Sequence, residues 1–189
     1  AAGTAAAIAL KNDVTVREIS QDKALIKKLQ NQLEKQETYV KSDNVTYPYK
    51  GEWYDESIQT LMDYGLVVAG YTNDLQVDKE ATVRKLVNLI RSGLMRADTD
   101  MNAELKQRVN AVHTDVFAKA DGPITRDEAA KILADIVQIS GSGNEWDELV
   151  SQGYISEDIA KYIPPDGSLT NKDIYAISAS FIEKLALQK

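Results

Sequence analysis

The chain has 189 residues, with 22 Lys or Arg against 29 Asp or Glu, so its formal net charge at pH 7 is −7. Hydrophobic residues make up 43% of it, enough for a buried core, while the acidic charge argues against general nucleic-acid binding because phosphate backbones are repelled. Cysteine is absent and His113 is the single histidine, which excludes disulfides and thiolate or multi-histidine metal sites and leaves little room for Ser-His-Asp catalysis. We therefore expect a binding or structural protein without metal or other cofactor, and not an enzyme.

Residues 1–10 form an Ala-rich apolar tract that ends at Lys11. The tract is far shorter than the ~20 apolar residues that cross a membrane, and no basic region precedes it, so it is not an intact signal peptide. We expect it to be either a new N-terminus left by cleavage or the cut end of a longer helix. Membrane attachment would then depend on flanking sequence.

The first 46 residues are predicted to form a long polar helix that acts as a stalk. Lys, Glu, Gln, Asp and Asn dominate residues 13–41, and neither Gly nor Pro occurs between Gly3 and Pro48. Aliphatic residues recur there at heptad spacing, namely Ile19, Ile26, Leu29, Leu33 and Val40. So thin a seam is typical of a short coiled coil, of a solvated helix that packs weakly on the rest of the chain, or of disorder. If the coiled coil forms, these five residues are the contacts of a homo-oligomer through residues 13–41.

After Pro48 the composition changes and amphipathic segments follow one another. Apolar residues recur with the i, i+3/i+4, i+7 spacing of a helix over residues 54–65, 83–94, 105–116, 132–137 and 174–185. Strand signals are limited to short runs such as residues 65–70, too brief for a sheet. The sequence therefore predicts a mainly α fold.

Residues 47–189 contain an internal repeat. Three helix starts lie 43 and 45 residues apart: Thr82-Val83-Arg84-Lys85, Thr125-Arg126-Asp127-Glu128 and Thr170-Asn171-Lys172-Asp173. Upstream of the first and third, Trp53 and Trp146 each lead an aliphatic stripe that ends at a glycine. The pattern predicts a helix, a glycine break, a loop and a capped helix, three times over, at about residues 47–94, 95–140 and 141–189.

Two stretches of the chain resemble the S-layer homology family: Trp53-x4-Ile58-x2-Leu61-x3-Gly65-Leu66-Val67-x2-Gly70-Tyr71-x2-Asp74 and Thr125-Arg126-Asp127-Glu128-Ala129-Ala130. They match its Trp-led helix, glycine turn, Gly-Tyr loop and Thr-Arg-x-Glu helix start. The resemblance covers about residues 47–189 and implies three helix-loop-helix repeats in a pseudo-threefold bundle. It also implies an exported protein, held noncovalently at the bacterial cell surface or envelope by a wall glycan or peptidoglycan.

The helix start at Thr125 combines a structural signal with a binding signal. Thr125 and Glu128 form the pattern of a capping box, in which each side chain bonds the backbone amide of the other. Capping does not explain Arg126, because the helix dipole disfavours a cation at the first helical position. Arg126 is therefore either a donor to an anionic ligand or the partner of a nearby carboxylate such as Asp127. In the family the equivalent arginine contacts acidic groups of the wall glycan.

The other two helix starts depart from the family pattern. Val83 and Asn171 replace the arginine and Lys85 replaces the glutamate, while Arg84 and Lys172 lie one position later. Two of the three repeats are thus degenerate, which keeps open a second function, a protein-interaction scaffold that assembles through its N-terminal coil.

The aromatic residues of the motifs have two interpretations. Trp53, Trp146 and Tyr71 could pack the repeats together or could stack on a sugar ring. Full burial of both tryptophans would favour the scaffold, whereas an open groove would favour glycan binding. The predicted ligand-binding residues are Arg126, Thr125, Glu128, Trp53, Trp146 and Tyr71.

Overall fold

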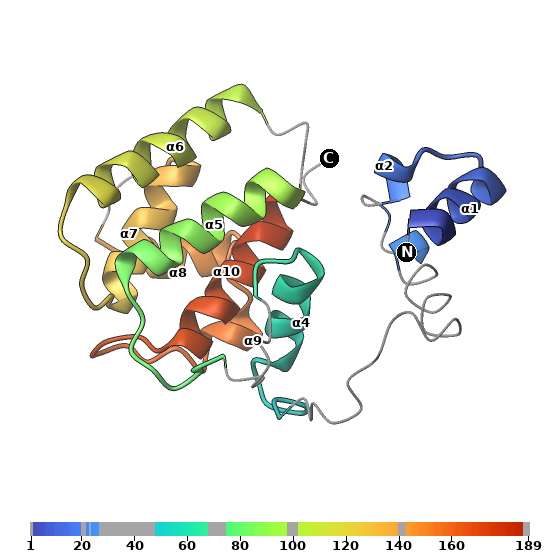
Figure 1. Ribbon diagram of the computed structural model, residues 1–189. Coiled ribbons are helices and arrows are strands. Elements are labelled where there is room, and N and C mark those ends of the chain that lie inside the picture. The colour runs from blue at the N-terminus through green and yellow to red at the C-terminus, as the bar shows by residue number, and fades with distance from the viewer. Residues whose placement is uncertain are drawn as a thin grey trace. The chain divides into compact units, whose positions relative to one another are not determined.

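A computed structural model describes residues 2–19, 22, 24–26, 48–67, 75–97, 102–139 and 143–186. The chain divides into two compact units, residues 1–46 and 47–189 (Figure 1). The described residues are mainly helical, and their β-type pairing is limited to isolated bridges. The mainly α class predicted from the sequence is therefore confirmed.

The N-terminal unit contains helices α1 (Ala2–Asn12) and α2 (Val16–Ile19). Asp13 ends α1 with a left-handed backbone, φ 53°, and Thr15 opens α2 by accepting the amide of Glu18 at 3.2 Å. The Glu18 carboxylate accepts the Thr15 amide at 2.6 Å in return, and these bonds lower the pKa of Glu18. The single long helix expected here is therefore interrupted between Asn12 and Val16, because the local capping groups start a new helix.

Ile19 faces a small apolar cluster inside this unit. It is buried with Ile8 and Ala9, and Val14 and Leu25 pack against them. The first residue of the expected heptad seam therefore has apolar partners in its own chain. Ile26 is partly buried, and Leu29, Leu33 and Val40 lie outside the described residues.

The C-terminal unit contains the other helices of the described residues. They are α4 (Asp55–Asp63), α5 (Val83–Ala97), α6 (Ala103–Ala118), α7 (Arg126–Val137), α8 (Glu145–Ser151), α9 (Glu157–Ala160) and α10 (Asn171–Ala186). Helix α4 packs on α10, α6 packs on both α5 and α7, and α8 packs on α7 (Figure 1). The five amphipathic stripes read from the sequence correspond to α4, α5, α6, α7 and α10.

Helix α10 supplies much of the core of this unit. All residues from Ile174 to Ala179 are buried, and Phe181 and Ile182 extend the buried stripe by another turn. Leu61 of α4, Leu86 of α5 and Leu133 of α7 belong to the same buried cluster. An amphipathic surface helix would bury one stripe only, so α10 occupies an interior position.

Three short segments that precede α5, α7 and α10 join in a closed ring of backbone hydrogen bonds. The Ala81 amide donates to the Leu169 carbonyl at 2.8 Å, and the Leu169 amide donates to the Ile124 carbonyl at 2.8 Å. The Ile124 amide completes the ring by donating to the Ala81 carbonyl at 3.2 Å. All three residues are fully buried, so each polar group depends on this ring for its partner. The ring holds the starts of three helices at one place.

Candidate functional site

The start of α7 is built by the capping box that the sequence predicted. The Thr125 hydroxyl accepts the Glu128 amide at 3.2 Å, and the Glu128 carboxylate accepts the Thr125 amide at 2.9 Å. Both side chains are therefore occupied by the backbone of their own helix. This local geometry sets the direction of Arg126, the first residue of α7.

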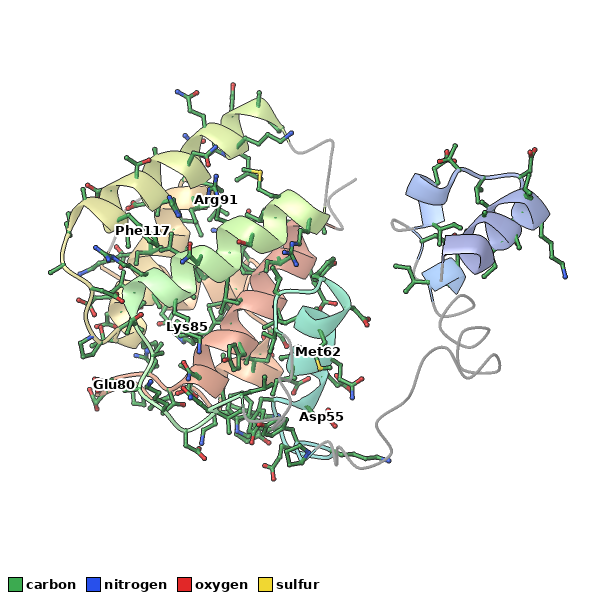
Figure 2. All side chains as sticks on the ribbon, viewed as in Figure 1. Asp55, Met62, Glu80, Lys85, Arg91 and Phe117 are labelled. Carbon is green, nitrogen blue, oxygen red and sulfur yellow. The ribbon has the colours of Figure 1, made fainter. Side chains whose placement is uncertain are left out.

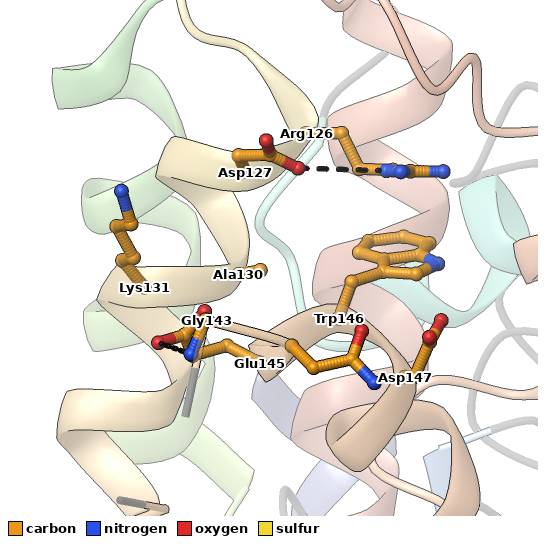
Figure 3. A pocket seen from close by; sticks show the side chains of 9 residues that line it. Arg126, Asp127, Ala130, Lys131, Gly143, Glu145, Trp146 and Asp147 are labelled. Atoms are coloured by element: carbon orange, nitrogen blue, oxygen red, sulfur yellow. Dashed lines mark hydrogen bonds and ion pairs between the residues drawn. The ribbon is translucent and has the colours of Figure 1, made fainter. Parts of the chain in front are cut away.

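Arg126 lies over the indole ring of Trp146, at the start of α8 (Figure 3). Its guanidinium carbon is 5.3 Å from the ring centre, within the range of a cation–π contact. The side chain is 25% exposed, and its nearest carboxylate oxygen, on Asp127, is 3.9 Å from Nε. That separation is too long for a hydrogen bond, and Nε is buried with no hydrogen-bond partner among the described residues. Because Nε is buried, the donors left for a ligand are the two terminal nitrogens, which form no hydrogen bond with the described residues.

A pocket of about 300 Å³ opens beside this pair, between α7 and α8 (Figure 3). It is lined by Arg126, Asp127, Ala130, Lys131, Gly143, Asn144, Glu145, Trp146 and Asp147. Its volume is at the lower end of the ~300–1,000 Å³ typical of small-molecule sites. Two cations and three carboxylates line it, so positive potential is confined to the neighbourhood of Arg126 and Lys131.

The amides at the start of α7 differ from those of the two related helices. On α5, the amides of Val83 and Arg84 donate to residues 122 and 121, at 3.1 Å each. On α10, the amides of Asn171 and Lys172 donate to residues 79 and 77, at 2.9 Å each. The first two amides of α7 have no such partner within the described part of the chain. Free amides at a helix start add to the positive potential near Arg126.

The basic residues that lie one position later in the other repeats have partners in the chain. The Arg84 guanidinium donates to the backbone carbonyls of Phe117 and Lys119 at 3.2 and 2.5 Å. Lys172 forms an ion pair of 2.5 Å with Asp78, and this hydrogen bond raises the pKa of Lys172. A terminal nitrogen of each residue is thus bound within the chain, whereas the terminal nitrogens of Arg126 have no hydrogen-bond partner among the described residues. Nε of Arg84 is buried and unpaired, as Nε of Arg126 is.

The two tryptophans have different environments. Trp146 is 8% exposed and lines the Arg126 pocket. Trp53 is partly buried, lies outside that pocket and stacks on Tyr162, with ring centres 4.9 Å apart and planes at 15°. The condition set from the sequence, full burial of both rings, is therefore not met. Tyr71, the third aromatic residue predicted to bind ligand, lies outside the described residues.

Of the six predicted site residues, the structure brings Arg126 and Trp146 into one pocket. Thr125 and Glu128 cap the helix beneath it and do not line it. Sequence reasoning missed the acidic wall made by Glu145 and Asp147. The signal was available, since these residues flank Trp146 directly.

No protein-family model, curated protein or solved structure matches this chain. Within the described ranges, no three His, Asp or Glu side chains are grouped so that they could hold a metal ion. None of the described helices is both long enough and apolar enough to span a bilayer.

Proposed function

We propose that this chain is a binding module that anchors a protein noncovalently to the bacterial cell envelope. Its ligand is an anionic wall polysaccharide or peptidoglycan, held in the pocket between α7 and α8. The observation that carries this proposal is Arg126, whose guanidinium lies 5.3 Å from the Trp146 ring and beside a pocket, and whose terminal nitrogens form no hydrogen bond with the described residues. On this proposal the protein is exported and acts at the cell surface without catalysing a reaction.

The chemistry of the pair suits an acidic sugar. A guanidinium presents a planar fork of donors that matches a carboxylate or phosphate. Trp146 is too buried to offer a broad stacking face, so its part is to position the guanidinium and remove water from one side of it. Arg126 is thereby the main contact for the anionic group, and the rest of the sugar occupies the pocket.

The three-repeat arrangement expected of an S-layer homology domain receives support from packing. Each first helix of a repeat packs on the second helix of the preceding repeat: α4 on α10, α6 on α5 and α8 on α7. The closed hydrogen-bond ring of Ala81, Ile124 and Leu169 has the same cyclic order. In this arrangement the Arg126 pocket is a groove between the second and third repeats.

Charge limits how this pocket can bind. The chain carries a net charge of −7, and Asp127, Glu145 and Asp147 line the pocket. Long-range attraction therefore does not draw a polyanion to the surface, and binding depends on short-range contacts at Arg126. Such a site is weak on its own, so several sites joined in one assembly would anchor more firmly.

A second function, a scaffold without glycan binding, is favoured by one set of contacts. Arg84, Lys172 and Trp53 are engaged by groups of the same chain, and the equivalent grooves lack the family's arginine. On this alternative, the N-terminal coil assembles copies of the chain and the repeats bind other proteins.

Cosedimentation with purified bacterial cell wall at low salt tests the anchoring proposal. Arg91→Ala is the matched control, because Arg91 lies between α5 and α6 and bonds Asn110 at 2.9 Å, away from the pocket (Figure 2). We expect wild type and Arg91→Ala to sediment with the wall and Arg126→Ala to remain in solution. If the wild-type chain does not sediment, anchoring is wrong and the scaffold is favoured. If Arg126→Ala sediments as well as wild type, the pocket is not the binding site.

A further inference from the structure

Helix α5 breaks the capping rule that its two counterparts follow. On α7 and α10, Glu128 and Asp173 stand three positions after the cap threonine and accept its amide, at 2.9 and 2.7 Å. On α5 this position is Lys85, which has no acceptor to offer. The amide of Thr82 consequently has no partner among the described residues. A local rule that is broken without compensation points to another role for the residue.

Lys85 turns from the helix start towards α10. Its ammonium group lies 2.9 Å from the Tyr175 hydroxyl, and that hydroxyl lies 3.1 Å from the backbone carbonyl of Leu75. The hydroxyl donates a hydrogen bond to the carbonyl, and its oxygen accepts a hydrogen bond from the Lys85 ammonium. Burial, with a smaller effect of the nearby Lys79, lowers the pKa of Lys85.

The Lys85 ammonium is a partly buried cation that has no counter-ion among the described residues. No carboxylate of the described residues lies within ion-pair distance of it. Buried or partly buried cations are usually paired with an anion, because removing a charge from water is costly. In a chain with a net charge of −7, an unpaired lysine at this position is unusual. One or more of its three donors remain for a ligand.

A pocket of about 280 Å³ adjoins the Lys85 ammonium. It is lined by Leu66, Val67, Leu75, Gln76, Lys85, Leu89 and Tyr175. Four of these side chains are aliphatic and Lys85 is the charged one. The pocket shares no residue with the Arg126 pocket, so it is a separate site.

We propose that the Lys85 pocket binds a small organic carboxylate with an apolar body. The carboxylate would accept hydrogen bonds from Lys85 and supply the missing counter-charge. The hydrocarbon body would pack on Leu66, Val67, Leu75 and Leu89. A phosphate suits the site less well, because Lys85 is the one cation among the seven lining residues and four of the others are aliphatic.

Methyl NMR of the full chain tests this proposal with benzoate as the probe. The methyl signals of Leu89 and Leu75 report on the pocket. Benzyl alcohol keeps the apolar body without the charge, and inorganic phosphate keeps a charge without the body. We expect saturable shifts with benzoate, and binding of benzyl alcohol and of phosphate that is about tenfold weaker or more.

Two variants separate this site from the Arg126 pocket. Lys85→Met keeps most of the aliphatic stem and should weaken benzoate binding about tenfold or more, whereas Arg126→Ala should leave the Leu89 shifts unchanged. Lys85→Gln is a second, polar replacement if the methionine variant does not fold. The proposal is overturned if benzoate causes no saturable shift, if benzyl alcohol binds as tightly, or if both Lys85 variants bind benzoate like wild type. Failure of cell-wall binding would leave these results untouched.

Discussion

Gly93 of α5 lies against Ile182 of α10 so closely that a β-carbon at Gly93 would stand 2.1 Å from Ile182 Cδ1. Leu66 Cδ1 would lie only 3.0 Å from the same β-carbon. Ile182 is fully buried, so it has little room to move aside. The absence of a side chain at Gly93 therefore sets the distance between α5 and α10, the two helices that position the Lys85 pocket.

Gly93→Ala should lower the free energy of unfolding, although alanine is the better helix former. Overpacking in a core costs about 1–3 kcal/mol, while the gain in helix propensity is about 1 kcal/mol. We expect a net loss of stability in urea denaturation. Gly122→Ala is the control, because a β-carbon at Gly122 meets no atom within 4 Å, and it should unfold like wild type. Equal urea midpoints for the two variants would mean that α10 moves aside to accommodate the new methyl group at residue 93.

Lys85→Glu should stabilise the protein by about 1 kcal/mol, the typical contribution of a cap. The new carboxylate would accept the Thr82 amide, as Glu128 accepts that of Thr125 on α7. The first turn of α5 holds no acidic residue, so the helix dipole would favour the change as well. The reciprocal change, Glu128→Lys, should destabilise the protein by a similar amount. Urea denaturation of both variants measures the two changes in unfolding free energy. A loss of stability in Lys85→Glu would contradict the proposed capping effect.

The stability of the protein should depend on pH through Lys85. Because burial lowers the pKa of Lys85 below 10.5, the unfolded chain binds more protons than the native protein between that lowered pKa and 10.5. Stability from this group therefore rises with pH across the window. The raised pKa values of Tyr54 and Tyr64 act in the opposite sense above pH 10, so wild type is compared with Lys85→Met, which shares both tyrosines. As pH rises across this window, the unfolding free energy of wild type should increase relative to that of Lys85→Met. A difference between the two proteins that does not change with pH would contradict this prediction.

Arg126→Ala should weaken cell-wall binding by about 1.5–3 kcal/mol, the usual loss for a charge-assisted contact. Its effect on stability should stay within about 1 kcal/mol, because a cation–π contact on Trp146 is lost but an unfavourable dipole interaction is removed too. Binding isotherms with wall fragments and urea denaturation give the two values. Arg126→Lys keeps the charge but not the planar fork, and should bind with intermediate strength. A large loss of stability with unchanged binding would assign Arg126 to structure.

Self-association through residues 13–41 remains a prediction. Because Ile19 is buried within its own unit, substitutions at Ile19 and at Leu33 should have different effects. Because Ile19 packs on Ile8 and Ala9 in its own unit, Ile19→Ser should disturb that unit more than any oligomer. Leu33→Ser should instead weaken association, if the heptad pattern forms a coiled coil. Sedimentation equilibrium of the full chain, of each variant and of a chain that starts at Tyr47 measures this. If the full chain is monomeric at high micromolar concentration, the coiled-coil prediction fails.

The sequence alone determined the helical class and the caps, because both depend on residues three or four positions apart. The i, i+4 stripes predicted α5, α6 and α10, and the Thr125–Glu128 spacing predicted a box whose two hydrogen bonds the structure contains. It also identified Arg126 as unexplained by capping, since the direction of the helix dipole is a local property. These features do not depend on which distant segment lies nearby.

Only the tertiary structure decided which groups surround the terminal nitrogens of the basic residues. Arg84 and Arg126 both lie in the first turn of a helix, yet Arg84 is taken by carbonyls more than 30 residues away, at Phe117 and Lys119. Arg126 meets Trp146 instead, and Lys85 meets Tyr175, 90 residues away. Hydrogen-bond partners at such separations are chosen by helix packing and by the ring that gathers the three helix starts. Whether a side-chain donor can bind a ligand therefore depends on the folded helix bundle, because the packing of the helices decides whether an acceptor of the same chain lies within reach.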